Sequence, residues 1–525
     1  MAKHAQQRHV TAPLETNTDL HIADGESSLA INESRRSLLK QSFAFAAVST
    51  TALATMACTS NASKTMSSTQ TFSTTSTNLP PKEFNPAQAW TRADEIVANI
   101  KTPQIPNRDF NITDFGAKPG KDNDALPAIR AAIISLVEQG GGRVVIPAGF
   151  WFVKGPIHFV SNMELHVSED AHLQFSGGPH HYMPLVKTRW EGTECYNYSP
   201  FIYALACHNI ALTGKGKIDG QGRDNFLILR PKQKPDQRLL RNMGRDGVPV
   251  EQRRFGPGHY LRPHFVQFYE CKQVLVDGPH LVDSPFWCIH PVYCDQVIVR
   301  NVKIDSRHVN SDGVDPDSST NVLVENCNFN VDDDGVAIKA GRDQDGWRVG
   351  RKSQNIVVRN CEYTGSKGGG MAIGSEMSGG VTDVYVENYK IPECRHMLYF
   401  KANNDRGGEI ERIYIRNIRS DYAETVIIFT NDYHSYRGGN YPTSFKNIVM
   451  EDVICERSKL GIHVFGNETA PVKNVTLRDI EIKQSDVVAQ VEHVENLVMD
   501  NVRVNGNVLT TELAKAQPKI KTPKH

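Results

Sequence analysis

One short pattern recurs along the chain from about residue 205: a polar residue, an alternating β-branched strand, Asn or Asp, and a second short strand. From its second occurrence the intervals are 23, 25, 34, 28, 29, 35, 27 and 22 residues. Repeats of about 20 to 50 residues are typical of solenoids, propellers and arrays. The occurrences begin at Asn209, Gln273, Gln296, Asn321, Asn355, Asp383, Arg412, Asn447, Asn474 and Asn496.

The content of the repeat selects one solenoid. No occurrence has a segment long enough for an amphipathic helix, and the Leu-x-x-Leu-x-Leu and Trp-Asp signatures are missing, which disfavours helical, leucine-rich and propeller repeats. A minimum spacing near 22 residues fits one rung of a three-sided parallel β-helix, with rungs about 4.8 Å apart. Asn and Asp suit the tight corners of such a rung. We therefore predict an all-β, single-domain parallel β-helix over residues 86–510.

The composition argues against several classes of protein. The chain of 525 residues has 59 basic and 59 acidic side chains, and this zero net charge argues against a nucleic-acid-binding protein or a polybasic membrane protein. Ten cysteines without paired Cys-x-x-Cys spacing do not predict a disulfide scaffold or structural zinc. We expect most of them to be buried thiols.

The N-terminal residues 1–58 read as an export signal. Ser34-Arg35-Arg36-Ser37-Leu38-Leu39-Lys40 precedes an apolar run, Phe43 to Ala57, of h-region size that is too short to span a bilayer, as in a bacterial twin-arginine signal. Cys58 is either the acylated first residue of a lipoprotein or lies beside an ordinary cleavage site. Residues 59–85 form a Ser/Thr-rich linker. We expect an exported protein that is periplasmic, anchored as a lipoprotein or secreted, and no transmembrane helix.

Four other segments have predicted roles in the domain. An amphipathic stretch at 87–100 predicts a helix packed on the domain's end. A helix near 126–139 is expected to cap the first rung. The charged segment 224–258, poor in β-branched residues, is expected to be a long loop that walls one end of a cleft. Residues 511–525 are predicted to be a polar tail.

Two acidic clusters carry the strongest chemical signal. Asn310-Ser311-Asp312-Gly313 is followed by Asp332-Asp333-Asp334-Gly335, and Asp312 and Asp333 are 21 residues apart, almost one rung. Neighbouring rungs would then place the carboxyl groups on one face, about 5 to 9 Å apart, a range that covers both glycosidase geometries. Clustered carboxylates also raise at least one pKa, which provides a protonated acid beside an ionised base. The alternative is a row of corner aspartates, or a calcium site built from Asp332 to Asp334.

These clusters and other motifs resemble glycoside hydrolase family 28, the polygalacturonase and rhamnogalacturonan-hydrolase family. The resemblance covers most of residues 110–505 and includes Gly214-Lys215-Gly216-Lys217-Ile218-Asp219-Gly220 and Ser284-Pro285-Phe286-Trp287. It implies a right-handed parallel β-helix and inverting hydrolysis. Asp333 would be the general acid, and Asp312 and Asp334 would activate the water.

Two positions depart from the polygalacturonase motifs. Gly369 stands where the Gly-His-Gly motif has its histidine, and Tyr399 stands where the Arg-Ile-Lys motif has its arginine, while its lysine is retained as Lys401. Tyr cannot reproduce the bidentate fork with which Arg binds a carboxylate. The departures favour a branched or mixed pectic substrate, such as rhamnogalacturonan, or another uronic-acid-containing polysaccharide.

Further residues are candidates for contact with the sugar. Lys401, Arg406 and Arg262 could pair with a sugar carboxylate, and His290 and His308 could hydrogen-bond the sugar or orient an aspartate. Asn310 belongs to the matched motif. Four aromatic residues are candidate platforms for sugar faces, with core packing as the alternative for Trp287: Trp190, Trp287, Tyr399 and Tyr433.

Three functions remain open at this stage. The first is an inverting glycoside hydrolase acting on a pectic or related polysaccharide, without metal or cofactor and as a monomer. The second is a β-helix polysaccharide lyase, which would use calcium and a Lys or Arg base. The third is a non-catalytic carbohydrate-binding solenoid.

Overall fold

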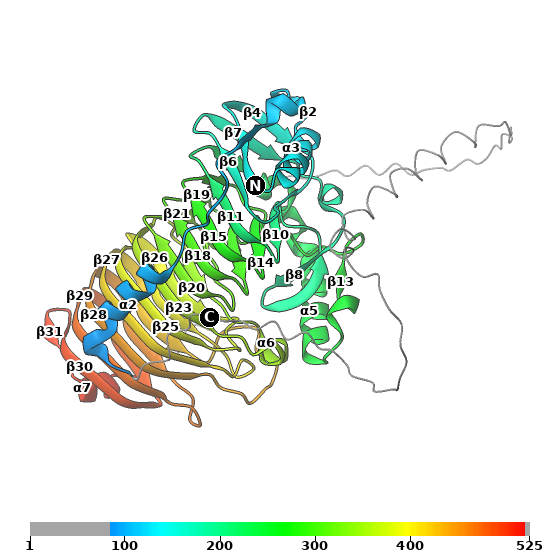
Figure 1. Cartoon of the computed structure of the whole chain (residues 1–525). Coiled ribbons are helices and arrows are strands. Elements are labelled where there is room, and N and C mark those ends of the chain that lie inside the picture. Colours follow the sequence, from blue (N-terminus) through cyan, green and yellow to red (C-terminus); the bar gives the residue numbers. More distant parts are fainter. Residues whose placement is uncertain (1–83, 520–525) are drawn as a thin grey trace, which may run out of the picture. The chain divides into compact units, whose positions relative to one another are not determined.

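A computed structural model describes residues 84–519 of the chain (Figure 1). The predicted twin-arginine signal, Cys58 and the linker up to residue 83 lie outside the described residues. The strands of the described part join by parallel pairing into one long sheet of 24 strands, with smaller sheets of four and three strands.

Three series of stacked strands form the three faces of the solenoid (Figure 1). The first face contains β1 (Asp109–Asn111), β3 (Gly142–Ile146), β6 (Met163–Val167), β11 (His208–Thr213), β15 (Lys272–Asp277), β18 (Asp295–Arg300), β20 (Thr320–Glu325), β23 (Ser353–Tyr363), β25 (Val381–Lys390), β27 (Glu409–Thr430), β28 (Ser444–Phe465), β29 (Val472–Glu492) and β30 (Val494–Val504). The second contains β2 (Gly120–Asp124), β4 (Gly149–Val153), β7 (Ala171–Phe175), β12 (Lys217–Asp219), β16 (His280–Val282), β19 (Lys303–Ser306) and β21 (Asn328–Val331). The third contains β5 (Ile157–His158), β10 (Ile202–Leu205), β14 (Val266–Tyr269), β17 (Ile289–Val292), β22 (Val336–Ile338), β24 (Gly369–Gly374) and β26 (Glu393–Lys401).

The later rungs are continuous strands that bend through the corners. β27 pairs with β25 through its first half and with β26 through its second half, so one strand serves two faces. The predicted right-handed parallel β-helix is therefore confirmed.

The corners explain the recurring polar residue of the sequence pattern. All ten predicted corner positions have a positive φ, between 51° at Asn209 and 61° at Gln296. Asparagine tolerates this left-handed conformation better than other non-glycine residues. Its side chain also links neighbouring rungs, because Asn355 Nδ2 donates to Asn321 Oδ1 at 3.0 Å and Asn474 Nδ2 donates to Asn447 Oδ1 at 2.9 Å.

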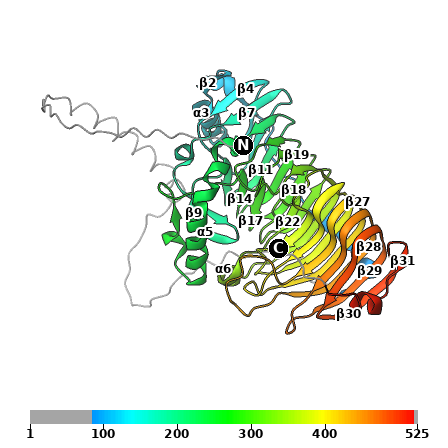
Figure 2. The ribbon, with the colours of Figure 1, turned by 180° about the vertical axis from the view of Figure 1, so that it is seen from behind.

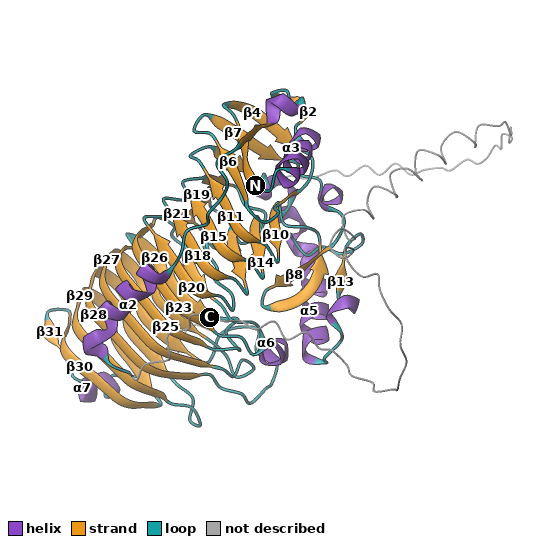
Figure 3. Ribbon diagram, in the orientation of Figure 1, coloured by secondary structure: helices purple, strands orange, loops and turns teal. Residues whose placement is uncertain are grey.

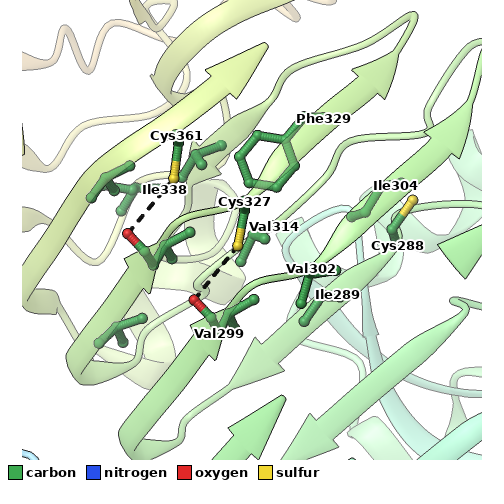
Figure 4. Packing of buried hydrophobic residues seen from close by; sticks show 14 of the residues in the cluster. Cys288, Ile289, Val299, Val302, Ile304, Val314, Cys327, Phe329, Ile338 and Cys361 are labelled. Carbon is green, nitrogen blue, oxygen red and sulfur yellow. Dashed lines mark hydrogen bonds between the residues drawn. The ribbon is translucent and has the colours of Figure 1, made fainter. Parts of the chain in front are cut away.

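The interior of the solenoid is filled by stacked apolar side chains and thiols (Figure 4). Cys327 and Cys361 lie in this stack beside Phe329, and their thiols reach main-chain carbonyls of the preceding rung. All nine cysteines between Cys195 and Cys455 are buried and free, as expected for small apolar core residues.

Helices close the two ends of the solenoid (Figure 3). α3 (Leu126–Glu138) covers the first rung and buries Ile129 and Leu136 against it. α7 (Thr511–Lys515) packs on β29 and β30 and buries Ala514. The predicted polar tail therefore begins with a short helix that protects the last rung.

The helix predicted near 87–100 is present as α2 (Ala89–Asn99), but it does not cap an end. It runs along the outside of the first face and contacts β20, β23 and β25 (Figure 1). Its apolar side packs on a ladder of outward-facing apolar residues from successive rungs and buries them, which explains its position: Ile298, Leu323, Val357, Tyr385, Tyr414 and Val449.

The segment 224–258 is helical and not the predicted loop. It contains the end of α4 (Gly222–Asn225), α5 (Arg230–Arg245) and the short strand β13 (Arg254–Phe255). α5 contacts β9 (Thr193–Asn197), which forms a hairpin with β8 (Val186–Trp190), and α6 (Asp343–Val349) (Figure 2). The sequence did not predict this helix because the residues that recur at helical spacing are charged and not apolar. Among residues 84–519 no helix is both long enough and apolar enough to cross a membrane.

The corner geometry predicts an order of stability for two substitutions of Asn355. Both Asn355→Ala and Asn355→Gly remove the bond to Asn321, but only alanine places a Cβ in the left-handed region, where φ is 56°. We expect the alanine variant to be less stable by about 1 kcal/mol in denaturant unfolding. The same pair at Asn123, an exposed residue without positive φ, should not favour glycine; equal stability of the two Asn355 variants would contradict the argument.

Candidate active site

A cavity of about 310 Å³ opens on the third face of the solenoid. Residues of neighbouring rungs form its floor, including Asp312, Asp333 and Lys401, while α5 and the segment 433–435 form its walls. The predicted wall from the 224–258 insertion is therefore present, in the form of a helix.

Of the three predicted catalytic aspartates, Asp312 and Asp333 line the cavity and Asp334 lies beside them. One oxygen each of Asp312, Asp333 and Asp334 lies within 4.8 Å of the others. Parallel pairing brings them together, because Gly313 N donates to Asp334 O at 2.9 Å and so aligns the two rungs. These nearest oxygens are closer together than the predicted 5 to 9 Å, so their separation by itself assigns neither inversion nor retention.

Asp333 has the environment of a proton donor. Burial raises the pKa of its carboxyl group, the neighbouring Asp334 raises it further, and Lys401 and the main chain of Asn310 oppose the rise. Its two oxygens accept hydrogen bonds from Asn310 N at 2.8 Å and Asp334 N at 3.1 Å, which fix its orientation. A carboxyl group held in place with a raised pKa is suited to act as a general acid.

Asp334 and Asp312 each face a buried lysine. Lys401 Nζ donates to Asp334 Oδ2, and Gly369 N donates to Asp334 Oδ1 at 2.9 Å. Lys339 Nζ lies 3.5 Å from Asp312 Oδ2, yet burial still raises the pKa of Asp312 well above its ordinary value. Of the two, Asp334 is the carboxylate in direct contact with a lysine, an arrangement suited to a base that accepts a proton from water.

The two lysines also bear on metal binding. Three carboxylate oxygens within 4.8 Å of one another form an arrangement able to hold a cation. However, Lys401 and Lys339 already place two positive charges beside these carboxylates, and they repel a divalent ion. The donor set therefore fits acid–base catalysis better than calcium binding.

The glycine at the position of the missing histidine touches the catalytic centre. A Cβ at Gly369 would lie 2.8 Å from Asp334 Oδ1 and 3.6 Å from the Tyr399 ring. The absence of a side chain lets the main-chain N–H of Gly369 approach Asp334 instead. This chain thus orients Asp334 with a main-chain donor, and a larger residue here would displace the carboxylate.

Of the predicted sugar-contacting residues, Asn310 and Lys401 line the cavity. Arg262 does not: it is fully buried, and its Nη2 donates to Asn310 Oδ1 at 2.6 Å while its Nε donates to Gln233 Oε1 at 2.9 Å. Arg262 therefore positions Asn310 and ties it to α5.

Four further predictions of sugar contact are not supported by the placement of these side chains, which are buried behind the cavity wall. His290 lies beside Gln267 and Asp317, and His308 beside Ser306. Arg406 donates to Ser375 O and pairs with Asp343. Tyr399 packs with Tyr433, its ring 5.0 Å from Lys401 Nζ. The physical reason is tertiary packing: side chains of neighbouring rungs, of α6 and of the segment at Tyr433 cover these residues, and the rung pattern does not reveal those contacts.

The aromatic candidates divide in the same way. Trp287 and Tyr433 line the cavity, and Lys339 Nζ lies 4.3 Å from the centre of the Trp287 ring. Trp190 is buried and stacks on Phe286 with ring centres 5.1 Å apart, so it belongs to the packing below the site.

Sequence reasoning missed a network of buried charges at one side of the cavity. Arg342 pairs with Glu376, and Arg241 Nη2 lies 2.6 Å from Glu191 Oε2. Lys339 Nζ is 3.6 Å from Glu376 Oε2. The repeat spacing could have indicated part of this network. The pairs Ile338↔Ile373 and Gly374↔Lys401 show that Lys339, Glu376 and Lys401 lie on consecutive rungs. Arg241 comes from the insertion, which no register predicts.

The β-helix and its buried carboxylate pair define a polysaccharide-processing enzyme of the glycoside hydrolase type. The model of glycosyl hydrolases family 28 matches residues 161–502. The chain belongs to this family and is an O-glycosyl hydrolase, as the resemblance predicted.

Similar proteins and solved structures agree with this family assignment. A hyperthermoactive exopolygalacturonase from Thermotoga maritima is similar with a TM-score of 0.77 and 39% identity, over 80% of this chain and 96% of that one. An endo-polygalacturonase from Pectobacterium parmentieri is 25% identical, over 78% of this chain and 94% of its own. A probable polygalacturonase from Vitis vinifera is 25% identical, over 71% of this chain and 74% of its own.

Replacement of the proton donor should abolish most activity. We expect Asp333→Asn to lower kcat by a factor of about 100 to 10,000, because the amide cannot protonate the leaving oxygen. The matched control is Asp332→Asn, whose carboxylate pairs with Arg307 and Lys367 outside the cavity. Equal losses in the two variants would contradict the assignment.

The pH profile should respond to Lys401. Lys401 lowers the pKa of Asp333, so in Lys401→Met the carboxyl group keeps its proton to higher pH. We expect the alkaline limb of kcat/KM to move to higher pH, together with a fall in kcat, because Asp334 loses its partner. Lys367→Met, which removes an exposed lysine paired with Asp332 at 2.9 Å, is the control and should leave the limb in place. A downward shift in Lys401→Met would overturn the sign.

Proposed function

We propose that this glycoside hydrolase removes galacturonate units from one end of a pectic galacturonan chain, with inversion at the anomeric carbon. The observation that carries the proposal is the convergence of Asp312, Asp333 and Asp334, the first two of which line a small walled cavity. The name of the Thermotoga maritima relative, 39% identical over most of both chains, supports the exo-acting form.

The roles follow from the environments of the carboxyl groups. Asp333 protonates the glycosidic oxygen as the bond to the leaving sugar breaks. Asp334 accepts a proton from the water that attacks the anomeric carbon from the opposite face, and Lys401 balances its charge. Asp312 lies beside them and is held by Lys339.

A uronate carboxylate has a donor in the cavity despite the tyrosine at position 399. Arg342 lines the cavity, is 4% exposed, and its Nη1 has no hydrogen-bond partner among the described residues. An unpaired buried guanidinium N–H is costly, and a sugar carboxylate would satisfy it. Arg342 thus supplies, from another rung, an arginine in place of the motif arginine that is Tyr399 in this chain.

The size of the cavity supports action at a chain end. Its volume of about 310 Å³ lies at the small end of the range for ligand sites. α5 on one side and the segment 433–435 on the other narrow it, whereas attack within a chain needs a cleft open in both directions.

Product analysis tests the proposal. On polygalacturonate we expect release of saturated monomer or dimer from the start of the reaction, with inverted anomeric configuration by proton NMR. Early intermediate-length products would contradict exo action, and retained configuration would contradict the mechanism. Unsaturated products that absorb in the near ultraviolet and disappear with a chelator would identify the lyase. Activity only on rhamnogalacturonan would contradict the proposed substrate and leave the proposed hydrolysis with inversion in place.

We further propose that a twin-arginine signal exports the protein, either for release or for anchoring through Cys58. The basis is the Arg35-Arg36 pair before an apolar run. In a bacterial host, replacing both arginines by lysine should retain the protein in the cytoplasm, as measured by fractionation. Incorporation of labelled fatty acid that is lost in Cys58→Ala would identify the lipoprotein, and unchanged export without the arginines would exclude this route.

A further inference from the structure

A row of positive side chains follows one face of α5. Arg230, Lys234 and Arg238 are spaced by four residues, and Arg241 follows three residues later. Residues three and four apart lie on the same side of a helix, about 6 Å apart along its axis. The helix therefore presents a straight line of cations.

The other side of α5 is anchored, which fixes the direction of this row. Leu240 packs in a buried cluster with Trp190 and Trp287. Asp236 accepts a hydrogen bond from Tyr260 N at 2.6 Å. Gly244 lies so close to β9 that a Cβ there would come 2.8 Å from Thr193 Cγ2. These contacts hold α5 against the neighbouring elements, and Arg230, Lys234 and Arg241 of the row line the catalytic cavity.

The row lines a second groove that continues the catalytic cavity. This groove of about 390 Å³ lies between α5 and the segment 435–437. Lys234, Gln237, Arg241 and Ser435 belong to the walls of both, so the two spaces are joined. Arg437 Nη2 donates to Asn242 Oδ1 at 2.8 Å and ties the far wall to α5.

The charge of the groove is one-sided. Its lining includes Lys234, Arg238, Arg241 and Arg437 and no acidic side chain. Arg241 is balanced by Glu191 in the catalytic cavity, but the other three form no ion pair within residues 84–519. In a chain whose net charge is zero, this concentration of unpaired positive charge is local.

We propose that this groove binds the uronate residues that follow the chain end held in the catalytic cavity, with Lys234, Arg238 and Arg437 pairing with successive carboxylates. The inference rests on the proposed function, since it takes the same polyanionic chain to occupy both spaces. A polyuronate carries one negative charge on each sugar, which matches a row of separate cations along a continuous groove. Exposed ion pairs are individually weak, so the row sets affinity for long chains and leaves the chemical step unaffected.

The experiment compares chain lengths in a variant that changes only the groove. Arg238 and Arg437 line the groove and not the catalytic cavity, so Arg238→Gln/Arg437→Gln removes two charges beyond the reacting sugar. We expect the ratio of KM for the galacturonate octamer to KM for the dimer to rise about 3- to 10-fold, as expected for two exposed ion pairs, with kcat for the octamer retained. An unchanged ratio would overturn the proposal.

A matched control has the same loss of charge elsewhere on the helix. Lys232 faces Tyr260, its Nζ 5.2 Å from the ring, and Arg245 pairs with Asp246; neither lines either space. Lys232→Gln/Arg245→Gln should keep the wild-type KM ratio. A rise equal to that of the groove variant would mean that general charge, and not the groove, attracts the substrate.

Binding without turnover separates this inference from the proposed function. In the Asp333→Asn background, calorimetry should give tighter binding of the octamer than of its methyl ester, and Arg238→Gln/Arg437→Gln should remove most of that difference. If binding behaves in this way but no galacturonan is hydrolysed, the groove stands and the proposed reaction fails. If hydrolysis proceeds while ester and acid bind alike, the groove fails and the reaction stands.

Discussion

The parallel register between rungs is the constraint on which this structure depends. Main-chain hydrogen bonds join each rung to the next. Because neighbouring rungs lie about 4.8 Å apart in a fixed register, residues at equivalent positions are stacked in rows. The interior rows are apolar and one outward row receives α2, while another contains Asp312 and Asp334. The corners maintain this register, since their left-handed residues end each strand at the same place and asparagine side chains bond from rung to rung.

The same stacking concentrates charge that an isolated strand could not hold. Asp312 and Asp315 are both buried, and burial raises the pKa of Asp315 to about 8 even though Lys339 Nζ lies 3.3 Å away. Burying a carboxylate is costly unless a cation or hydrogen bonds compensate it. Lys339 and Lys401 provide that compensation, since Lys339 lies beside Asp312 and Asp315 and Lys401 contacts Asp334. Asp333 lines the cavity with a raised pKa and has no lysine within ion-pair distance among residues 84–519. The catalytic asymmetry thus arises from the unequal distribution of two lysines among three aspartates.

The insertion turns an open face of the solenoid into a walled site. Arg230, Lys234, Gln237 and Arg241 of α5 form one wall of the cavity whose floor includes Asp312 and Lys401. Arg241 and Gln237 also surround Glu191, and Arg262 joins Gln233 to Asn310 beside the proton donor. The helix therefore acts on the catalytic residues as well as on the shape of the site. Its own stability comes from few apolar contacts, chiefly Leu240, and from hydrogen bonds such as that of Asp236 to the main chain of Tyr260.

Local sequence determined the solenoid, its corners and the catalytic aspartates, because a rung is specified by residues close in the chain and its repetition is visible as spacing. The spacing of Asp312 and Asp333 by 21 residues was enough to place them on one face. Tertiary structure decided which cations and aromatics reach the substrate. His290, Arg262 and Arg406 are buried by side chains from other segments, whereas Arg342, Glu376 and Arg241 meet at the cavity from three separate segments. No spacing rule relates a helix between rungs to the rungs it covers, since that contact depends on side-chain packing and not on the period of the backbone.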